Sequence, residues 1–197
     1  MDKKRLTILL DVMIALVMVW MVQNNLFVPA ERSLAGFMEN NVRRGFQRAG
    51  ASELWLIAIW LGMYRPWDRA IRISSAVAAL GAGLALCVLG TGFFTSLIIN
   101  SYIARFSQMV YGGWMLLTLV ACWFMQLALE RVNADAPDCV AASRRWRRAL
   151  SVAIGLLCAG MAVCAIRYTQ AMWYSVGAAA LAMLAMTVFS DAKKADA

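Results

Sequence analysis

One acidic residue, Asp11, lies within a long apolar run and is the residue of this sequence best placed to do chemistry. A carboxylate inside a membrane is costly, usually faces the interior of a helical bundle and often marks a functional site. Asp11 could therefore hold a proton or a cation, or contact another subunit. It could also lie close enough to the membrane interface to pair with a basic residue such as Arg72. No second ionisable residue in another apolar run supports a proton relay.

The sequence contains no histidine. This excludes Ser-His and Cys-His nucleophile pairs, bis-imidazole haem sites and the HExxH zinc motif. An intramembrane aspartyl protease needs two acids at depth, and only Asp11 is available. The five cysteines form no C-x-x-C pair, so neither a disulfide framework nor a metal site is predicted. We expect a protein without enzymatic activity and without a cofactor.

The elements that position these residues are long apolar runs, since 62% of the 197 residues are hydrophobic. Runs of 18 or more apolar residues are typical of membrane-spanning helices. The predicted spans are 6–28, 73–99, 108–129, 150–166 and 172–189, and the short segment 54–64 is a further candidate. We expect an all-α transmembrane helical bundle that forms one integral membrane domain over residues 1–197. Six spans are favoured and five are possible.

The basic residues cluster at the ends of the predicted spans and account for the net charge of +8. This is the distribution of the positive-inside rule, so nucleic-acid binding is not predicted. Both span models place the connection 100–106 outside, and the connection 130–149 and the carboxyl terminus inside. Charge counting decides neither the side of the amino terminus nor whether 54–64 crosses. The short connections and the terminal Lys193 and Lys194 favour a bacterial inner-membrane protein with a cytoplasmic carboxyl terminus.

Small residues recur at helical spacing along four predicted spans, which indicates faces that pack against other helices. The expected faces are Ser74, Ala78, Gly81, Ala85, Val88, Gly92 and Thr95; Gln108, Gly112, Met115, Leu119, Cys122 and Gln126; Ser151, Gly155, Cys158, Ala162 and Ala165; and Ser175, Ala178, Ala182 and Ala185. We expect the spans that carry them to pack closely together.

Gln108 and Gln126 add polar groups to the span 108–129, and with Asp11 they make up a candidate intramembrane polar site. Both amides lie near the ends of their span, where we expect water or lipid headgroups to satisfy them. On this interpretation they do not line a transport pathway.

Two basic segments are candidates for contacts with anionic lipid or with a partner. The segment 29–53 contains a predicted amphipathic interfacial helix, whose basic face carries Arg43, Arg44 and Arg48. The second segment carries Arg144, Arg145, Arg147 and Arg148 beside a span. Arginines there can hold lipid phosphates at about 1 kcal/mol each, or simply fix the orientation of the chain.

These features favour a small polytopic membrane protein without catalytic activity. We expect an accessory, scaffold or immunity/exclusion-type component that acts through contacts with lipid and with a membrane-protein partner, or as a homo-oligomer. The alternative is a small transporter or channel that uses Asp11 as a proton or cation site. The sequence shows no convincing inverted repeat, which is the usual trace of such carriers.

Overall fold

The computed structural model describes residues 7–8, 11–19, 43–100, 105–168 and 171–195, with backbone alone for 43–49, 99–100 and 188–195. All regular structure in these ranges is helical, so the predicted all-α bundle is confirmed. Its long helices are α3 (Arg43–Asp68), α4 (Ser75–Asn100), α5 (Arg105–Val132), α6 (Pro137–Ile166) and α7 (Ala171–Ala195). The helical residues 7–8 and 11–19, here called the N-terminal segment, precede them.

Three of the long helices have both the length and the composition of membrane-spanning elements. With 25 to 30 residues each, α3 to α7 extend about 38 to 45 Å, and a hydrocarbon core is about 30 Å thick. Helices α4, α5 and α6 are long and apolar enough to cross a membrane, and among its described side chains α7 offers the shorter apolar stretch Ala171–Thr187. These helices indicate an integral membrane protein.

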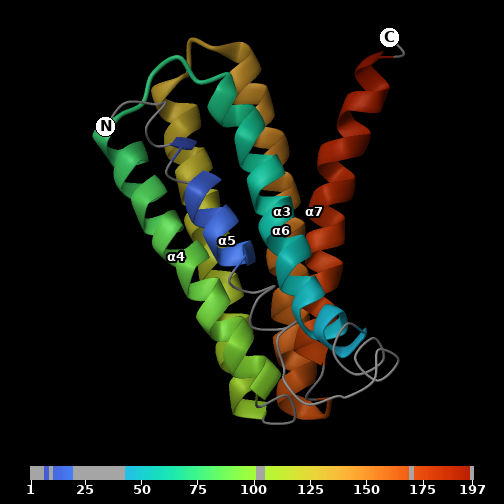
Figure 1. The fold of residues 1–197 in the computed structure, drawn as a ribbon. Helices are drawn as coiled ribbons and strands as arrows, with labels where there is room; N and C mark the ends of the chain where they lie inside the picture. The colour runs from blue at the N-terminus through green and yellow to red at the C-terminus, as the bar shows by residue number, and fades with distance from the viewer. Residues whose placement is uncertain (1–6, 9–10, 20–42, 101–104, 169–170, 196–197) are drawn as a thin grey trace.

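Successive helices run antiparallel and are joined by short connections (Figure 1). Helix α5 packs between α4 and α6, while α7 packs between α6 and α3. The connections 69–74 and 133–136 and the carboxyl terminus lie at one end of the bundle, and the start of α3 lies at the other (Figure 1). We call the first end the basic end. It holds Arg65, Arg69, Arg72, Arg131, Arg144, Arg145, Arg147 and Arg148.

The N-terminal segment runs antiparallel to α3. The indole nitrogen of Trp67, near the end of α3, donates a hydrogen bond to Thr7 Oγ1 at 2.7 Å, and that of Trp60, two turns earlier, donates to Asp11 Oδ1 at 2.8 Å. Ile14 and Val17 of the segment are buried. Thr7 therefore lies toward the basic end, as it would if the segment and α3 crossed a membrane in opposite directions.

Two expected boundaries differ from the structure. The short segment 54–64 is the second half of the continuous helix α3, because residues 43–53 contain no proline and carry on as helix. The expected connection 130–149 is far shorter, since α5 ends at Val132 and α6 begins at Pro137. Proline suits the first position of a helix, where its missing N–H has no intrahelical acceptor.

Close helix contacts are made at glycines, whose missing side chains leave room for a neighbour. Trp146 packs against Gly62, Trp114 against Gly90, Met172 against Gly112 and Ser175 against Gly160. The predicted contact faces of α4 and α5 are confirmed. The buried members are Gly81, Ala85, Val88, Gly92 and Thr95 of α4, and Gln108, Gly112, Met115, Leu119, Cys122 and Gln126 of α5.

The predicted contact face of α6 is wrong for the chain by itself. All five of its residues are exposed, namely Ser151, Gly155, Cys158, Ala162 and Ala165. Helix α6 instead packs through a face on which Trp146, Leu150 and Leu157 alternate with small residues, and Gly160 allows a close approach to α7. On α7 the expected face is mixed, because Ala178 is exposed and Ser175, Ala182 and Ala185 are half-buried.

Candidate functional site

Asp11 lies at the surface of the bundle, where the N-terminal segment meets α3. Within the described residues its partner is the indole of Trp60, which is itself 40% exposed. A shallow, mostly apolar pocket surrounds the contact, lined by Thr7, Asp11, Ile14, Trp60, Met63, Tyr64 and Trp67. The structure thus gives Asp11 a neutral donor instead of Arg72, the basic partner expected as one alternative. It also places the carboxylate at the periphery of the bundle and away from its centre.

Gln108 and Gln126 are fully buried, which corrects the expectation that water or headgroups would satisfy them. Both project from the packed face of α5 toward the core. Neither amide atom of Gln126 has a hydrogen-bond partner in the described part of the chain. The two amides lie 18 residues apart, about 27 Å along the helix. Asp11 contacts α3 instead, so the three residues form no common site.

A buried hydroxyl cluster, which the sequence analysis missed, joins α3, α4 and α5. The Oγ of Ser52 lies 2.6 Å from the hydroxyl oxygen of Tyr111, and Thr95 Oγ1 lies 3.0 Å from Ser52 Oγ and 2.7 Å from the Thr91 carbonyl oxygen. These hydroxyls are all buried. Hydrogen bonds between spanning helices are worth about 0.6 kcal/mol on average, so the cluster aligns three helices at modest energetic gain. The sequence predicted that Thr95 lies on a contact face, but it could not identify Ser52, which is distant in sequence, as the partner.

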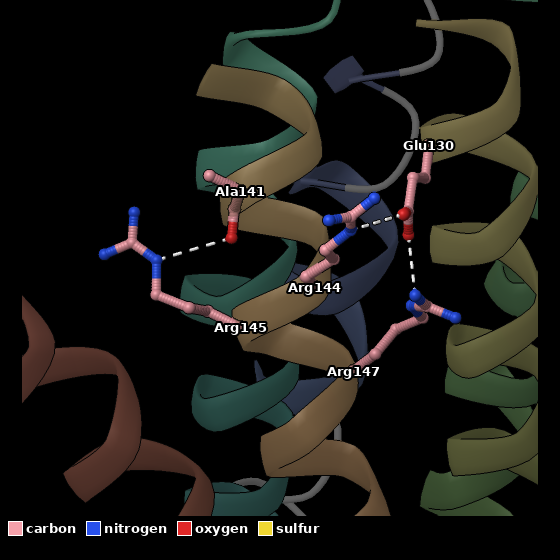
Figure 2. Close-up of polar contacts among 5 residues, drawn as sticks. All are labelled: Glu130, Ala141, Arg144, Arg145 and Arg147. Atoms are coloured by element: carbon pink, nitrogen blue, oxygen red, sulfur yellow. Dashed lines mark hydrogen bonds and ion pairs between the residues drawn. The ribbon is translucent and has the colours of Figure 1, made fainter. Parts of the chain in front are cut away.

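The arginine cluster of α6 is divided between two sides of that helix (Figure 2). Glu130 of α5 accepts from Arg144 Nε at 2.8 Å and lies 2.7 Å from Arg147 Nη2. Arg147 also lies over the ring of Trp123, with its Cζ 5.5 Å from the centroid. Arg145 projects from the other side, and its Nε donates to the Ala141 carbonyl oxygen at 3.4 Å. Two of the predicted lipid-contacting arginines are therefore engaged by an acid, and Arg145 faces elsewhere.

The remaining basic candidates are placed by the backbone alone. Arg43, Arg44 and Arg48 lie in the first two turns of α3, at the end opposite the basic end (Figure 1). Their side chains lie outside the described part of the structure, and so does the segment 29–42 of the predicted amphipathic helix. Arg148 is exposed on α6.

The side chain of Asn133, which the sequence analysis passed over, links two elements of the basic end by hydrogen bonds. Its Oδ1 accepts from the backbone N–H groups of Ile71 and Arg72, each at 2.8 Å. Its Nδ2 donates to the carbonyl oxygens of Arg72 and Leu129, at 2.9 and 3.0 Å. These four bonds use the full capacity of a side-chain amide, and they tie the connection 69–74 to the end of α5. The sequence feature that could have identified this role is the position of Asn133 directly after a long helix, where a side-chain amide can bond the backbone of a connection.

Comparison of the chain with protein-family models, curated proteins and solved structures gives no match. Among the described residues, no three His, Cys, Asp or Glu side chains gather as a metal site would require. The candidate sites are therefore the surface around Asp11 and the arginines of the basic end.

Proposed function

We propose that this protein is a non-catalytic component of the membrane that binds a transmembrane helix of a partner protein through the surface around Asp11. The observation that supports this is the peripheral position of a carboxylate within an apolar segment. Asp11 is exposed, and Trp60 gives it one neutral hydrogen bond.

The surroundings of Asp11 have the character of a helix contact. Exposed apolar residues of the same segment flank it, namely Ile8, Val12, Leu16 and Val19. A carboxylate facing lipid is costly, and intramembrane acids normally pair with another residue. One N–H donor leaves most of the acceptor capacity of a carboxylate unused. A partner helix with a basic or amide side chain at this depth would satisfy it.

The exposed small-residue face of α6 gives further support. Lipid-facing positions do not require small residues, whereas close helix contacts do. Gly155, at the centre of this face, has no other atom within 4 Å of the position that a Cβ would take. The face predicted to pack is thus available to a helix from outside the chain.

The proposed topology has six crossings, with both termini and the basic end in the cytoplasm. The antiparallel placement of the N-terminal segment against α3 supports the sixth crossing. The concentration of arginine at one end supports the orientation, because cytoplasmic connections are enriched in Lys and Arg. Residence in a bacterial inner membrane belongs to the same proposal and is supported by the short connections.

The test is capture of the tagged full-length chain from its native membrane in mild detergent, with the composition of the complex measured by mass spectrometry. We expect a stoichiometric membrane-protein partner, and at least a tenfold loss of that partner in Asp11→Asn with unchanged abundance of the chain. Asp138→Asn is the matched control, because it removes an exposed carboxylate at the start of α6. A chain that purifies alone, or as a homo-oligomer only, contradicts the proposal.

The same variant separates this proposal from the transporter alternative. If Asp11→Asn abolishes ion flux into proteoliposomes that contain the purified chain alone, Asp11 is a transport site and the accessory role is wrong. If the wild-type chain shows no flux, the transporter alternative is rejected. The capture experiment then decides whether the partner-binding role is correct.

A further inference from the structure

A cavity lies at the basic end between α3, α6 and α7. Its cavity volume is about 30 Å³, and the empty space with its open mouth included is about 380 Å³. Three arginines line it, Arg65 in the last turn of α3, Arg69 directly after α3, and Arg145 in α6. Trp146, Pro66 and Thr187 are among its other lining residues.

A close contact between α3 and α6 forms one side of this cavity. The ring of Trp146 occupies the space that a side chain at Gly62 would need, so the indole lies directly on the α3 backbone. One turn later, Pro66 has no N–H to bond the Gly62 carbonyl oxygen, which weakens the helix at this point. Cys139 Sγ donates to the Pro66 carbonyl oxygen at 3.4 Å and so fastens α6 to this turn.

Two of the three arginines of the cavity are held in place by backbone oxygens. Arg65 Nη1 donates to the Thr187 carbonyl oxygen at 2.7 Å, which joins α3 to α7, and Arg145 Nε donates to the Ala141 carbonyl oxygen. Among the described residues, no carboxylate lines the cavity. Within the described residues, neither Arg69 nor Arg145 pairs with an acid. Glu130, the acid that pairs with the α6 cluster, is engaged on the other side of α6 by Arg144 and Arg147 (Figure 2).

Three guanidinium groups around one cavity match the chemistry of a phosphate group. A guanidinium presents several N–H donors in a plane, which suits the oxygens of a phosphate better than a point charge does. Arg65 lies one turn before the end of α3, and Arg145 lies about 12 Å from the start of α6 by the helical rise. In an integral membrane protein this is the level of lipid headgroups. Met186, 40% exposed on α7, adds an apolar part to the rim.

We propose that this cavity binds a phosphate group, as carried by an anionic phospholipid headgroup or by free phosphate. The site uses none of the residues around Asp11, so it stands whether or not the partner-binding role is correct. Arg69 and Arg145 supply charge that no acid of the described residues neutralises, and Trp146 forms a rigid wall.

The experiment is native mass spectrometry of the full-length chain in detergent, titrated with short-chain phosphatidylglycerol. Short-chain phosphatidylcholine is the zwitterionic comparison. We expect the wild-type chain to bind one phosphatidylglycerol in preference to phosphatidylcholine. The double variant Arg69→Gln/Arg145→Gln should bind it at least tenfold more weakly. The control Arg72→Gln/Arg148→Gln removes the same charge from two exposed arginines of the basic end outside the cavity, and should bind like the wild type.

Inorganic phosphate distinguishes the two sources of the ligand. If millimolar phosphate displaces phosphatidylglycerol, the cavity recognises the phosphate group itself; if it does not, recognition extends to the lipid. Equal weakening by both double variants would show general attraction to a basic surface and would overturn the proposal, as would equal binding of the two lipids. Arg145→Lys checks that a loss does not come from misfolding, because it keeps the charge and should bind with intermediate strength.

Discussion

The contact between Gly160 and Ser175 offers a sharp test of how α6 and α7 pack. The side chain of Ser175 fills the space that a Cβ on Gly160 would need, and its own Cβ is fixed by the backbone of α7. An added methyl group therefore has to push the two helices apart. Gly155 lies in the same helix but has open space at its Cβ position. Gly155→Ala is thus a matched control for Gly160→Ala.

The size of the effect follows from the comparison of the two variants. Each replaces glycine by alanine within α6, so each gains the same helix propensity of about 0.8–1 kcal/mol. That gain cancels in the difference. What remains is the cost of overpacking at Gly160, about 1–3 kcal/mol. At about 2–4 °C per kcal/mol for a chain of this length, Gly160→Ala should unfold about 2–12 °C below Gly155→Ala.

The assay is heating of the tagged chain in detergent, followed by size-exclusion chromatography of the protein that remains dispersed. Adding Ser175→Gly to Gly160→Ala removes the clashing atoms and should restore most of the lost stability. Unfolding of Gly160→Ala and Gly155→Ala at the same temperature would refute this packing of α6 against α7. Failure of Ser175→Gly to compensate would refute the assigned contact.

Two further predictions use the same heating assay. Asn133→Ala removes four hydrogen bonds and leaves the N–H groups of Ile71 and Arg72 without their acceptor, so it should cost about 2–4 kcal/mol at roughly 1 kcal/mol per bond. Asn133→Asp keeps the acceptor but sets a second oxygen against the carbonyl oxygens of Arg72 and Leu129, so it should lose stability as well; an unchanged melting temperature in either variant would contradict the four-bond arrangement. Tyr111→Phe removes one hydroxyl from the buried cluster and should cost about 0.5–1.5 kcal/mol, because Ser52 keeps Thr95 as a partner. A loss above about 3 kcal/mol would mean that the cluster does more than align helices.

The pattern of apolar runs was enough to predict the helical bundle and the packed faces of α4 and α5. Small residues at helical spacing identify a face that neighbours approach closely, and Gly81, Ala85 and Gly92 do lie on such a face. The same rule failed on α6, where the small residues are exposed. A face of small residues shows that another helix can pack closely there, but it does not show whether that helix belongs to the same chain.

The sequence alone also misjudged where polar groups lie. Gln108 and Gln126 were placed at the ends of their span by counting residues, but α5 extends past both, from Arg105 to Val132, and buries them. The division of the α6 arginines was equally hidden. It depends on Glu130 of another helix and on the 100° rotation between neighbouring helical residues, which sends Arg144 and Arg145 to different sides.

Composition and periodicity by themselves determined the class of this protein: the absence of histidine, the apolar helices and the basic ends of the spans are properties of the chain. The tertiary structure decided which polar residues meet. It put Asp11 beside Trp60 at the periphery, Asn133 against the connection 69–74, and three arginines from two helices around one cavity. The physical reason is that helix formation depends on neighbours within a few residues, whereas each of these sites joins groups more than 45 residues apart in sequence, which only the packing of whole helices brings together.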